Sequence, residues 1–163
     1  MSFDFTTLIT DRTAEDYKHW EYLRNKGFLN MTEAERAEWL ADNMKGAYHK
    51  SDLNRVGECL NYLHGRLSEA GYITYLTTFT AKTNWTVASI PTAADLTYYL
   101  KCVSNIREAM AQFENTPPAP TDTGALSIDE ANDIEKILID VETLINNMLA
   151  SRYYCGDVYA GEI

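Results

Sequence analysis

Apolar residues recur at alternating steps of three and four positions in three long stretches of the chain. In the last stretch, from Ser127 to about Met148, this spacing predicts a helix with one apolar stripe. The stripe consists of Ala131, Ile134, Leu138, Val141, Ile145 and Met148. Four charged residues, Asp129, Asp133, Lys136 and Asp140, are expected on the opposite face. Such a helix needs neighbours that cover its stripe.

The two other stretches begin near Ser51 and Pro91 and supply partners of similar length. Their stripes are Leu53, Val56, Leu60, Leu63, Leu67 and Ala70 in one, and Leu96, Tyr99, Val103, Ile106, Met110 and Phe113 in the other. Gly57 and Gly65 each cost their helix about 1 kcal/mol relative to alanine, so we expect close packing at one of them. The sequence therefore predicts a mainly α-helical fold, an antiparallel bundle of three long helices.

Helix start signals predict two shorter helices before the bundle. Thr13 with Asp16 and Thr32 with Glu35 have capping-box spacing, and Ser127 with Glu130 repeats it before the last long helix. Glycines are expected to end the two short helices, at Gly27 and near Gly46.

The expected organisation is a single domain, residues 1–163. It comprises an extended arm at 1–10, N-terminal helices at 13–46, a three-helix bundle at 51–150 with a linker at 114–125, and an extended C-terminal tail at 152–163. Residues 72–80 are rich in β-branched and aromatic residues and predict a short strand or an extended connector. The linker contains a PxxP motif, which could bind an aromatic groove but is better explained as a helix connector.

The charge pattern narrows the choice of partners. A net charge of -10 argues against nucleic acid, because phosphate backbones are bound by clustered Lys and Arg. From Glu114 to the end there are ten acidic residues and only two basic ones, so a basic partner would be steered to this third of the chain. A solvated acidic face is the simpler interpretation.

No sequence motif indicates catalysis, a metal or a cofactor. The phosphate-binding, nucleophile-elbow and zinc-protease motifs are absent, and Cys59, Cys102 and Cys155 lack metal-site spacing. Cys59 and Cys102 lie beside apolar stripes and are expected as half-buried free thiols. Glu130, Asp133 and Glu135 invite a cation site, but Glu135 is expected to point away from Asp133. We therefore predict a protein that is not an enzyme. The chain shows no signal peptide and no span of membrane-crossing length, which predicts cytoplasmic synthesis without membrane insertion.

Aromatic residues outside the helix stripes are the candidate contact residues. Tyrosine suits contact surfaces because its ring is apolar and its hydroxyl is polar. The candidates are Phe3, Phe5, Tyr72, Tyr75, Trp85, Tyr153, Tyr154 and Tyr159. Alternatively, the Tyr and Trp residues of this set form a second small core under the connector.

Several segments resemble a family of short proteins from bacterial phages and prophages. The segments are LITDRT (8–13), MTEAERAEWL (31–40), MKGAY (44–48), DLNRVG (52–57), KTNW (82–85), SIPT (89–92), EANDIEKIL (130–138) and GDVYAGE (156–162). Similar chains carry Asp before the tryptophan of KTNW, where this chain has Asn84. These proteins occur among tail and baseplate genes, so the resemblance implies a component of a virion or tail-like particle and transfers no catalytic residue.

The resulting expectation is a structural or adaptor subunit of a phage tail, baseplate or fibre that contacts other virion proteins and could form a homo-oligomer. The alternative is a carbohydrate- or host-receptor-binding module that uses surface Tyr and Trp residues. The resemblance supports the first function, and the surplus of aromatic residues supports the second.

Overall fold

A computed structural model describes residues 2–72, 77–89, 91–121 and 126–156 of the chain, with residues 152–156 described by their backbone alone. Within these ranges the chain forms five α-helices and two short 3₁₀ helices, and no strand. The elements are η1 (Phe5–Thr7), α1 (Ala14–Lys26), η2 (Phe28–Asn30), α2 (Glu33–Leu40), α3 (Lys50–Glu69), α4 (Ala93–Glu108) and α5 (Ile128–Gly156). Residues 77–80 form an irregular connector, so the strand alternative fails there.

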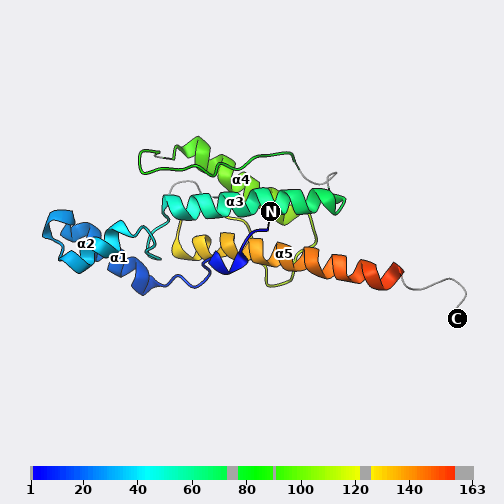
Figure 1. The fold of residues 1–163 in the computed structure, drawn as a ribbon, viewed down its shortest axis with the longest axis horizontal. Coiled ribbons are helices and arrows are strands. Elements are labelled where there is room, and N and C mark those ends of the chain that lie inside the picture. The colour runs from blue at the N-terminus through cyan, green and yellow to red at the C-terminus, as the bar shows by residue number, and fades with distance from the viewer. Residues whose placement is uncertain (1, 73–76, 90, 122–125, 157–163) are drawn as a thin grey trace, which may run out of the picture.

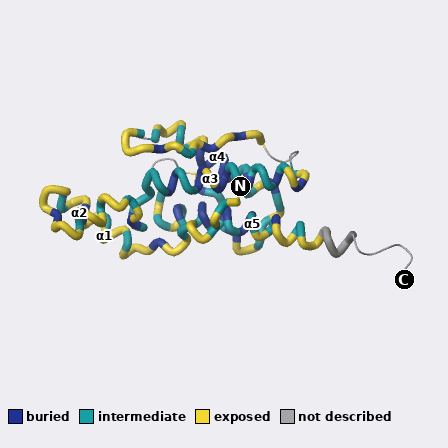
Figure 2. The backbone as a smooth tube through the Cα atoms, viewed as in Figure 1, coloured by how far each residue is buried: buried dark blue, intermediate teal, exposed yellow. Residues whose placement is uncertain are grey.

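The three long helices α3, α4 and α5 pack against one another around one core, which confirms the mainly helical bundle (Figure 1). The predicted stripes supply most of that core. Leu60, Val103 and Leu138 are fully buried, one from each helix. Buried positions run along the inside of the bundle in Figure 2. The predicted free thiols Cys59 and Cys102 are also buried, and burial raises the pKa of both.

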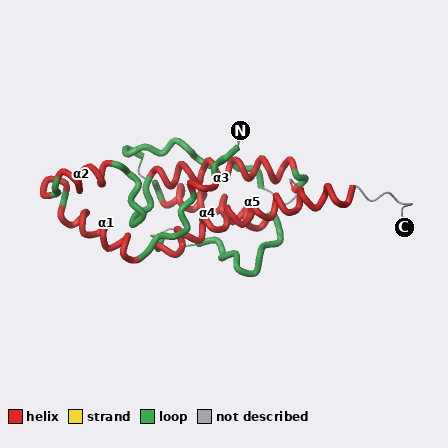
Figure 3. The backbone as a smooth tube through the Cα atoms, turned by 60° about the horizontal axis from the view of Figure 1, so that its bottom comes forward, coloured by secondary structure: helices red, strands yellow, loops and turns green. Residues whose placement is uncertain are grey.

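The helices of the bundle do not alternate in direction as the antiparallel prediction requires. Arg55 and Arg66 of α3 contact Glu135 and Glu142 of α5, so these two helices run in the same direction, as the first and third helices of an alternating bundle also would. The direction of α4 decides: the Tyr99 hydroxyl, in its first half, lies 2.6 Å from that of Tyr48, just before α3, so α4 starts at the same end of the bundle as α3 and α5 (Figure 1). The long connectors between the helices run back along the bundle, visible as loops in Figure 3, and this return path lets successive helices point the same way.

Several helix boundaries differ from the sequence prediction. His49 rather than Ser51 precedes α3, because the Asp52 carboxylate accepts the His49 backbone N–H at 2.8 Å. The short helix α2 ends at Leu40 instead of near Gly46. At the C-terminus, α5 continues to Gly156, so residues 152–156 are helical rather than part of an extended tail.

The end of α4 is also earlier than predicted, at Glu108 instead of about Phe113. The connector that follows packs on the bundle: Arg107 donates to the Pro117 carbonyl at 2.7 Å, and Thr116 donates to Asp140 at 2.7 Å. Asp140 is therefore buried and not on the exposed face where the helical period placed it. These contacts fit a helix connector rather than an open PxxP ligand.

Of the two glycines inside α3, Gly57 is the one that is closely packed against another segment. A methyl group on its Cα would lie 2.4 Å from the Lys82 carbonyl oxygen, whereas nothing lies within 4 Å of the corresponding position at Gly65. The connector from Phe79 to Trp85 lies against α3 here, held by Asn61 and Asn54, whose side-chain amides each pair with the connector backbone. Trp85 is thereby buried in the main core.

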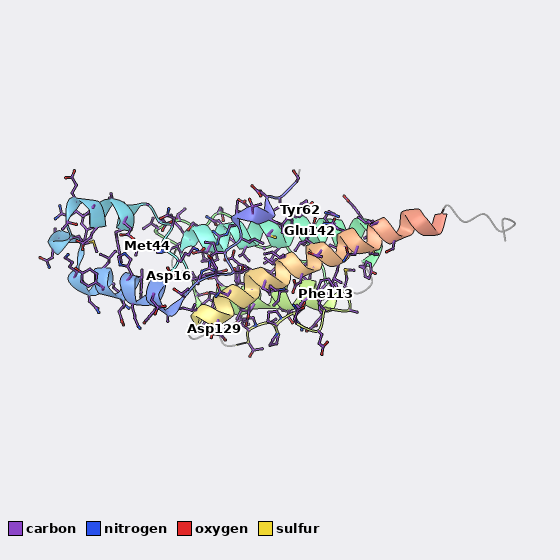
Figure 4. The ribbon with its side chains drawn as sticks, turned by 90° about the horizontal axis from the view of Figure 1, so that it is seen from below. Asp16, Met44, Tyr62, Phe113, Asp129 and Glu142 are labelled. Atoms are coloured by element: carbon purple, nitrogen blue, oxygen red, sulfur yellow. The ribbon has the colours of Figure 1, made fainter. Side chains whose placement is uncertain are left out.

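Residues 13–41 form a helical hairpin that projects from one end of the bundle, with the turn between α1 and α2 at its far end (Figures 1 and 4). Both predicted capping boxes are present, at Thr13 and Thr32, and Gly27 ends α1 with a positive φ of 74°. The hairpin has a small core of its own, formed with the following loop by Leu23, Met31 and Met44. Among the helices that the structure describes, none is long and apolar enough to span a bilayer.

Candidate functional site

A cluster of four charged side chains, three buried and the fourth (Arg55) partly exposed, joins the N-terminal segment to the bundle. Glu135 is fully buried, and its carboxylate accepts from Arg12 at 2.6 Å and from Arg55 at 2.9 Å. Arg12 also lies 3.0 Å from Asp52, which pairs with Arg55 as well. Two cations thus face two anions, and buried charges are tolerated when they are paired in this way.

Backbone hydrogen bonds hold Arg12 in place. The Ile9 N–H donates to Glu135 at 2.6 Å, and the Asn132 side chain bonds both the N–H and the carbonyl of Arg12 at 3.0 Å. The segment before α1 is therefore fastened to the first turns of α5. Both carboxylates, Asp52 and Glu135, are paired with arginine side chains. The cluster is therefore better suited to holding the N-terminal segment on the bundle than to reacting with a substrate.

Two tyrosines extend the cluster into the core. The Arg12 guanidinium lies over the Tyr48 ring, 5.4 Å from its centroid, and the hydroxyls of Tyr48 and Tyr99 are 2.6 Å apart. Burial raises the pKa of both phenols, and the Glu135 charge raises that of Tyr48 further. Both hydroxyls therefore stay protonated and serve as hydrogen-bonding groups.

A cleft of about 830 Å³ lies outside this cluster, between α1, residues 45–48 and the start of α5. Arg12 forms part of its wall, and Tyr17, Trp20 and Tyr48 contribute aromatic rings. The loop wall lies tightly on α1: a methyl group at Gly46 would come within 2.0 Å of the Asp16 carbonyl oxygen. In Figure 4, the labels of Asp16 on α1 and Asp129 on α5 mark the two helices that flank the cleft.

The hairpin carries most of the exposed large apolar side chains. Tyr17, Tyr22, Phe28, Leu29 and Leu40 are exposed there, whereas only Val87 and Tyr98 are exposed elsewhere in the described part of the chain. Leu29 is 87% exposed and Leu40 69%. Exposed apolar side chains on one projecting element are candidate contacts for a partner.

The turn that presents Leu29 is held by Arg36 of α2. The Arg36 guanidinium donates to the Phe28 and Leu29 carbonyls at 3.1 and 2.9 Å and lies over the Phe28 ring. A side chain presented on a backbone that is already ordered loses less entropy when a partner binds. The tip is therefore preorganised for contact.

An ion pair closes the hairpin: the Lys26 ammonium lies 2.7 Å from Glu35. The hydrogen bond from Lys26 is the main cause that lowers the pKa of Glu35 from 4.5 to about 2, and the hydrogen bond from the Thr32 backbone N–H is the second. A carboxylate whose pKa is lowered by folding contributes stability above its unfolded pKa, and that contribution disappears as the pH falls through the folded value.

We therefore expect the stability gap between the wild type and Glu35→Gln to be present at neutral pH and to shrink between about pH 4.5 and 2. The measurement is urea unfolding of both proteins at a series of pH values, with circular dichroism as the signal. A gap that stays constant down to pH 2 would contradict a role for the Glu35 charge.

The structure does not bring the predicted contact residues together. Trp85 is only 6% exposed, so it belongs to the core and is not a surface contact residue. Phe3 and Phe5 pack on the protein's own Tyr62 ring, at centroid distances of 6.4 and 5.9 Å. Phe5–Thr7 form a 3₁₀ helix, so the predicted arm is not extended throughout. Tyr72 is half-buried against the same core. Tyr75 and Tyr159 and the side chains of Tyr153 and Tyr154 lie outside the described residues.

Arg12 was not predicted as a site residue, and Glu135 was considered only as a cation ligand, although the sequence contains one signal for its burial. Glu135 follows Ala131 by four positions and precedes Leu138 by three, which places it inside the apolar stripe. A charged residue in a stripe indicates a buried partner. No local signal marks Arg12, because its partners Asp52 and Glu135 are distant in sequence.

Comparisons with protein-family models, curated proteins and solved structures find no match to this chain. Among the residues that the structure describes, no group of three or more His, Cys, Asp or Glu side chains is placed to hold a metal ion.

Proposed function

We propose that this protein is a structural or adaptor subunit of a phage tail, baseplate or fibre, and that it acts through protein–protein contacts. The observation that carries the proposal is the hairpin, where exposed apolar side chains gather on an element that projects from a well-packed bundle. The particle context comes from the sequence resemblance. A contact surface on a projecting element suits a protein that links neighbours in an assembly.

The carbohydrate- or receptor-binding alternative keeps one supporting observation. Trp85, which it relied on, is buried, and Tyr72 is half-buried. The cleft still offers aromatic rings at Tyr17 and Trp20. The exposed leucines of the hairpin favour a protein partner, because aliphatic side chains without polar groups contribute little to sugar recognition.

The proposal predicts that Leu29→Gln combined with Leu40→Gln abolishes incorporation into particles without lowering stability. Both side chains are exposed, so the fold loses little, while a partner surface loses two apolar contacts. The matched control is Val87→Gln, which changes an equally exposed side chain outside the hairpin. Each chain would be supplied in trans to a phage that lacks the gene, and purified particles would be analysed by immunoblot.

The expected pattern is loss for the double variant and wild-type levels for Val87→Gln. Equal incorporation of all three chains would contradict the hairpin as the contact surface. Urea unfolding of each variant would separate a lost contact from a lost fold.

A further inference from the structure

The cleft is continuous with the apolar surface of the hairpin. Tyr17 belongs to both, since it lines the cleft and is one of the exposed aromatic residues of α1. Its ring lies 5.8 Å from that of Trp20, so the two form one aromatic wall. Tyr, Trp and Arg dominate the side chains that contribute most to binding at protein interfaces. A volume of about 830 Å³ is large enough to receive side chains of a partner.

The charges around the cleft are uneven. The two cations of its wall are already neutralised, Lys45 by Asp11 at 2.7 Å and Arg12 by Glu135 at 2.6 Å. By contrast, Asp129 on the α5 side of the cleft forms no ion pair with any described residue. Arg24, whose guanidinium lies over the Trp20 ring at 5.3 Å from its centroid, is outside the lining. Among the charged residues that line the cleft, the one without an ion pair to a described residue is therefore negative.

Two further carboxylates strengthen this negative potential. Glu130 and Asp133 lie within one turn of Asp129 and likewise lack an ion pair in the described part of the chain. Partial burial raises the pKa of Asp133, and the charges of Asp129 and Glu130 raise it further. Because the whole chain carries -10, no long-range positive field offsets these groups.

We propose that the cleft binds a basic segment of a partner protein, with an aromatic or aliphatic side chain against the wall formed by Tyr17 and Trp20 and a Lys or Arg beside Asp129. This inference rests on the proposed function and names the chemistry of the partner surface. Complementary charge at the rim of an interface mainly raises the association rate and makes binding sensitive to salt.

The test uses two synthetic peptides, one with a tryptophan between lysines and one with the same tryptophan between glutamates. Each is titrated into the full-length ¹⁵N-labelled protein, and the amide signals of Ala14, Gly46 and Ala131 report on the cleft. We expect the lysine peptide to shift these signals and the glutamate peptide to leave them in place. The effect should weaken as salt rises from about 0.05 to 0.5 M.

Two pairs of variants locate the binding. Asp129→Asn should weaken the lysine peptide about threefold, whereas Glu114→Gln, at an exposed acid in the linker, should not. Tyr17→Ala should weaken it about tenfold, whereas Tyr98→Ala, at an exposed tyrosine of α4, should not. Thermal unfolding of each variant shows whether the fold is retained.

The inference is overturned if neither peptide shifts the cleft signals, if the two peptides bind equally, or if Asp129→Asn binds like the wild type. A response to a neutral oligosaccharide such as maltotriose, without a response to the lysine peptide, would also overturn it and assign the cleft to sugar. Such a failure is distinguishable from failure of the proposed function, which depends on particle incorporation of the Leu29 and Leu40 variant.

Discussion

Replacing Glu135 by glutamine is expected to destabilise the protein by about 3 kcal/mol. The substitution keeps the shape of the side chain and removes the charge that Arg12 and Arg55 share. Among the described residues, Asp52 would then be the one carboxylate that pairs with both guanidinium groups, so one of the two positive charges would lack a paired anion beside the buried Arg12. Removing one partner of a buried ion pair is costly because the other charge stays desolvated.

The change in the free energy of unfolding is measured by urea unfolding, with tryptophan fluorescence as the signal. The matched control is Glu58→Gln, the same substitution at an exposed position of α3, which should stay within about 0.5 kcal/mol of the wild type. Equal stability of the Glu135 and Glu58 variants would show that the cluster does not lock the N-terminal segment to the bundle.

Gly57→Ala is expected to lower the free energy of unfolding by about 2–3 kcal/mol. In a free helix the substitution would stabilise, because alanine has the higher helix propensity. Here the new methyl group would lie 2.4 Å from the Lys82 carbonyl oxygen, so the connector that carries Trp85 would have to move. The resulting loss of core packing outweighs the gain in propensity.

Gly65→Ala provides the control within the same helix. Its added methyl group meets nothing within 4 Å, so we expect a stabilisation of about 0.5–1 kcal/mol. If the connector lies where the structure places it, thermal and urea unfolding show a lower free energy of unfolding for Gly57→Ala and a higher one for Gly65→Ala. Two stabilised variants would show that α3 and the connector do not touch at Gly57.

The start of most helices could be predicted from residues close together in the sequence. Thr13, Thr32 and Ser127 each form the capping box that their spacing predicts, since all the groups involved lie within four residues. The stripes of the long helices likewise identify the buried face, because the helical period is a local property. His49 was missed because histidine is not a typical cap, and Asp52 provides the hydrogen bond instead.

Long-range features could not be predicted from local patterns. A stripe shows which face is buried but not which way the neighbouring helix runs, and here the path of the long connectors determines the direction. Trp85 follows no helical period, so its burial depends on the pairing of Asn54 with the connector. The cleft combines α1 with the start of α5, two elements more than a hundred residues apart in sequence.

The hairpin surface also had no sequence signal of its own. No local pattern distinguishes Leu29 and Leu40 from apolar residues that become buried, and both are exposed on the projecting hairpin. Among the aromatic candidate contact residues, Trp85 is buried in the core, and Phe3 and Phe5 are partly buried against it. Composition alone does not distinguish an aromatic ring that packs inward from one that awaits a partner.

The most direct test of a particle subunit is quantitative mass spectrometry of purified phage particles from a host that expresses the wild-type chain. The proposed function predicts that this chain co-purifies with the particles, in a constant ratio to other tail proteins, through successive density gradients. Recovery of the chain only in the free protein fraction, with intact particles lacking it, would contradict that function.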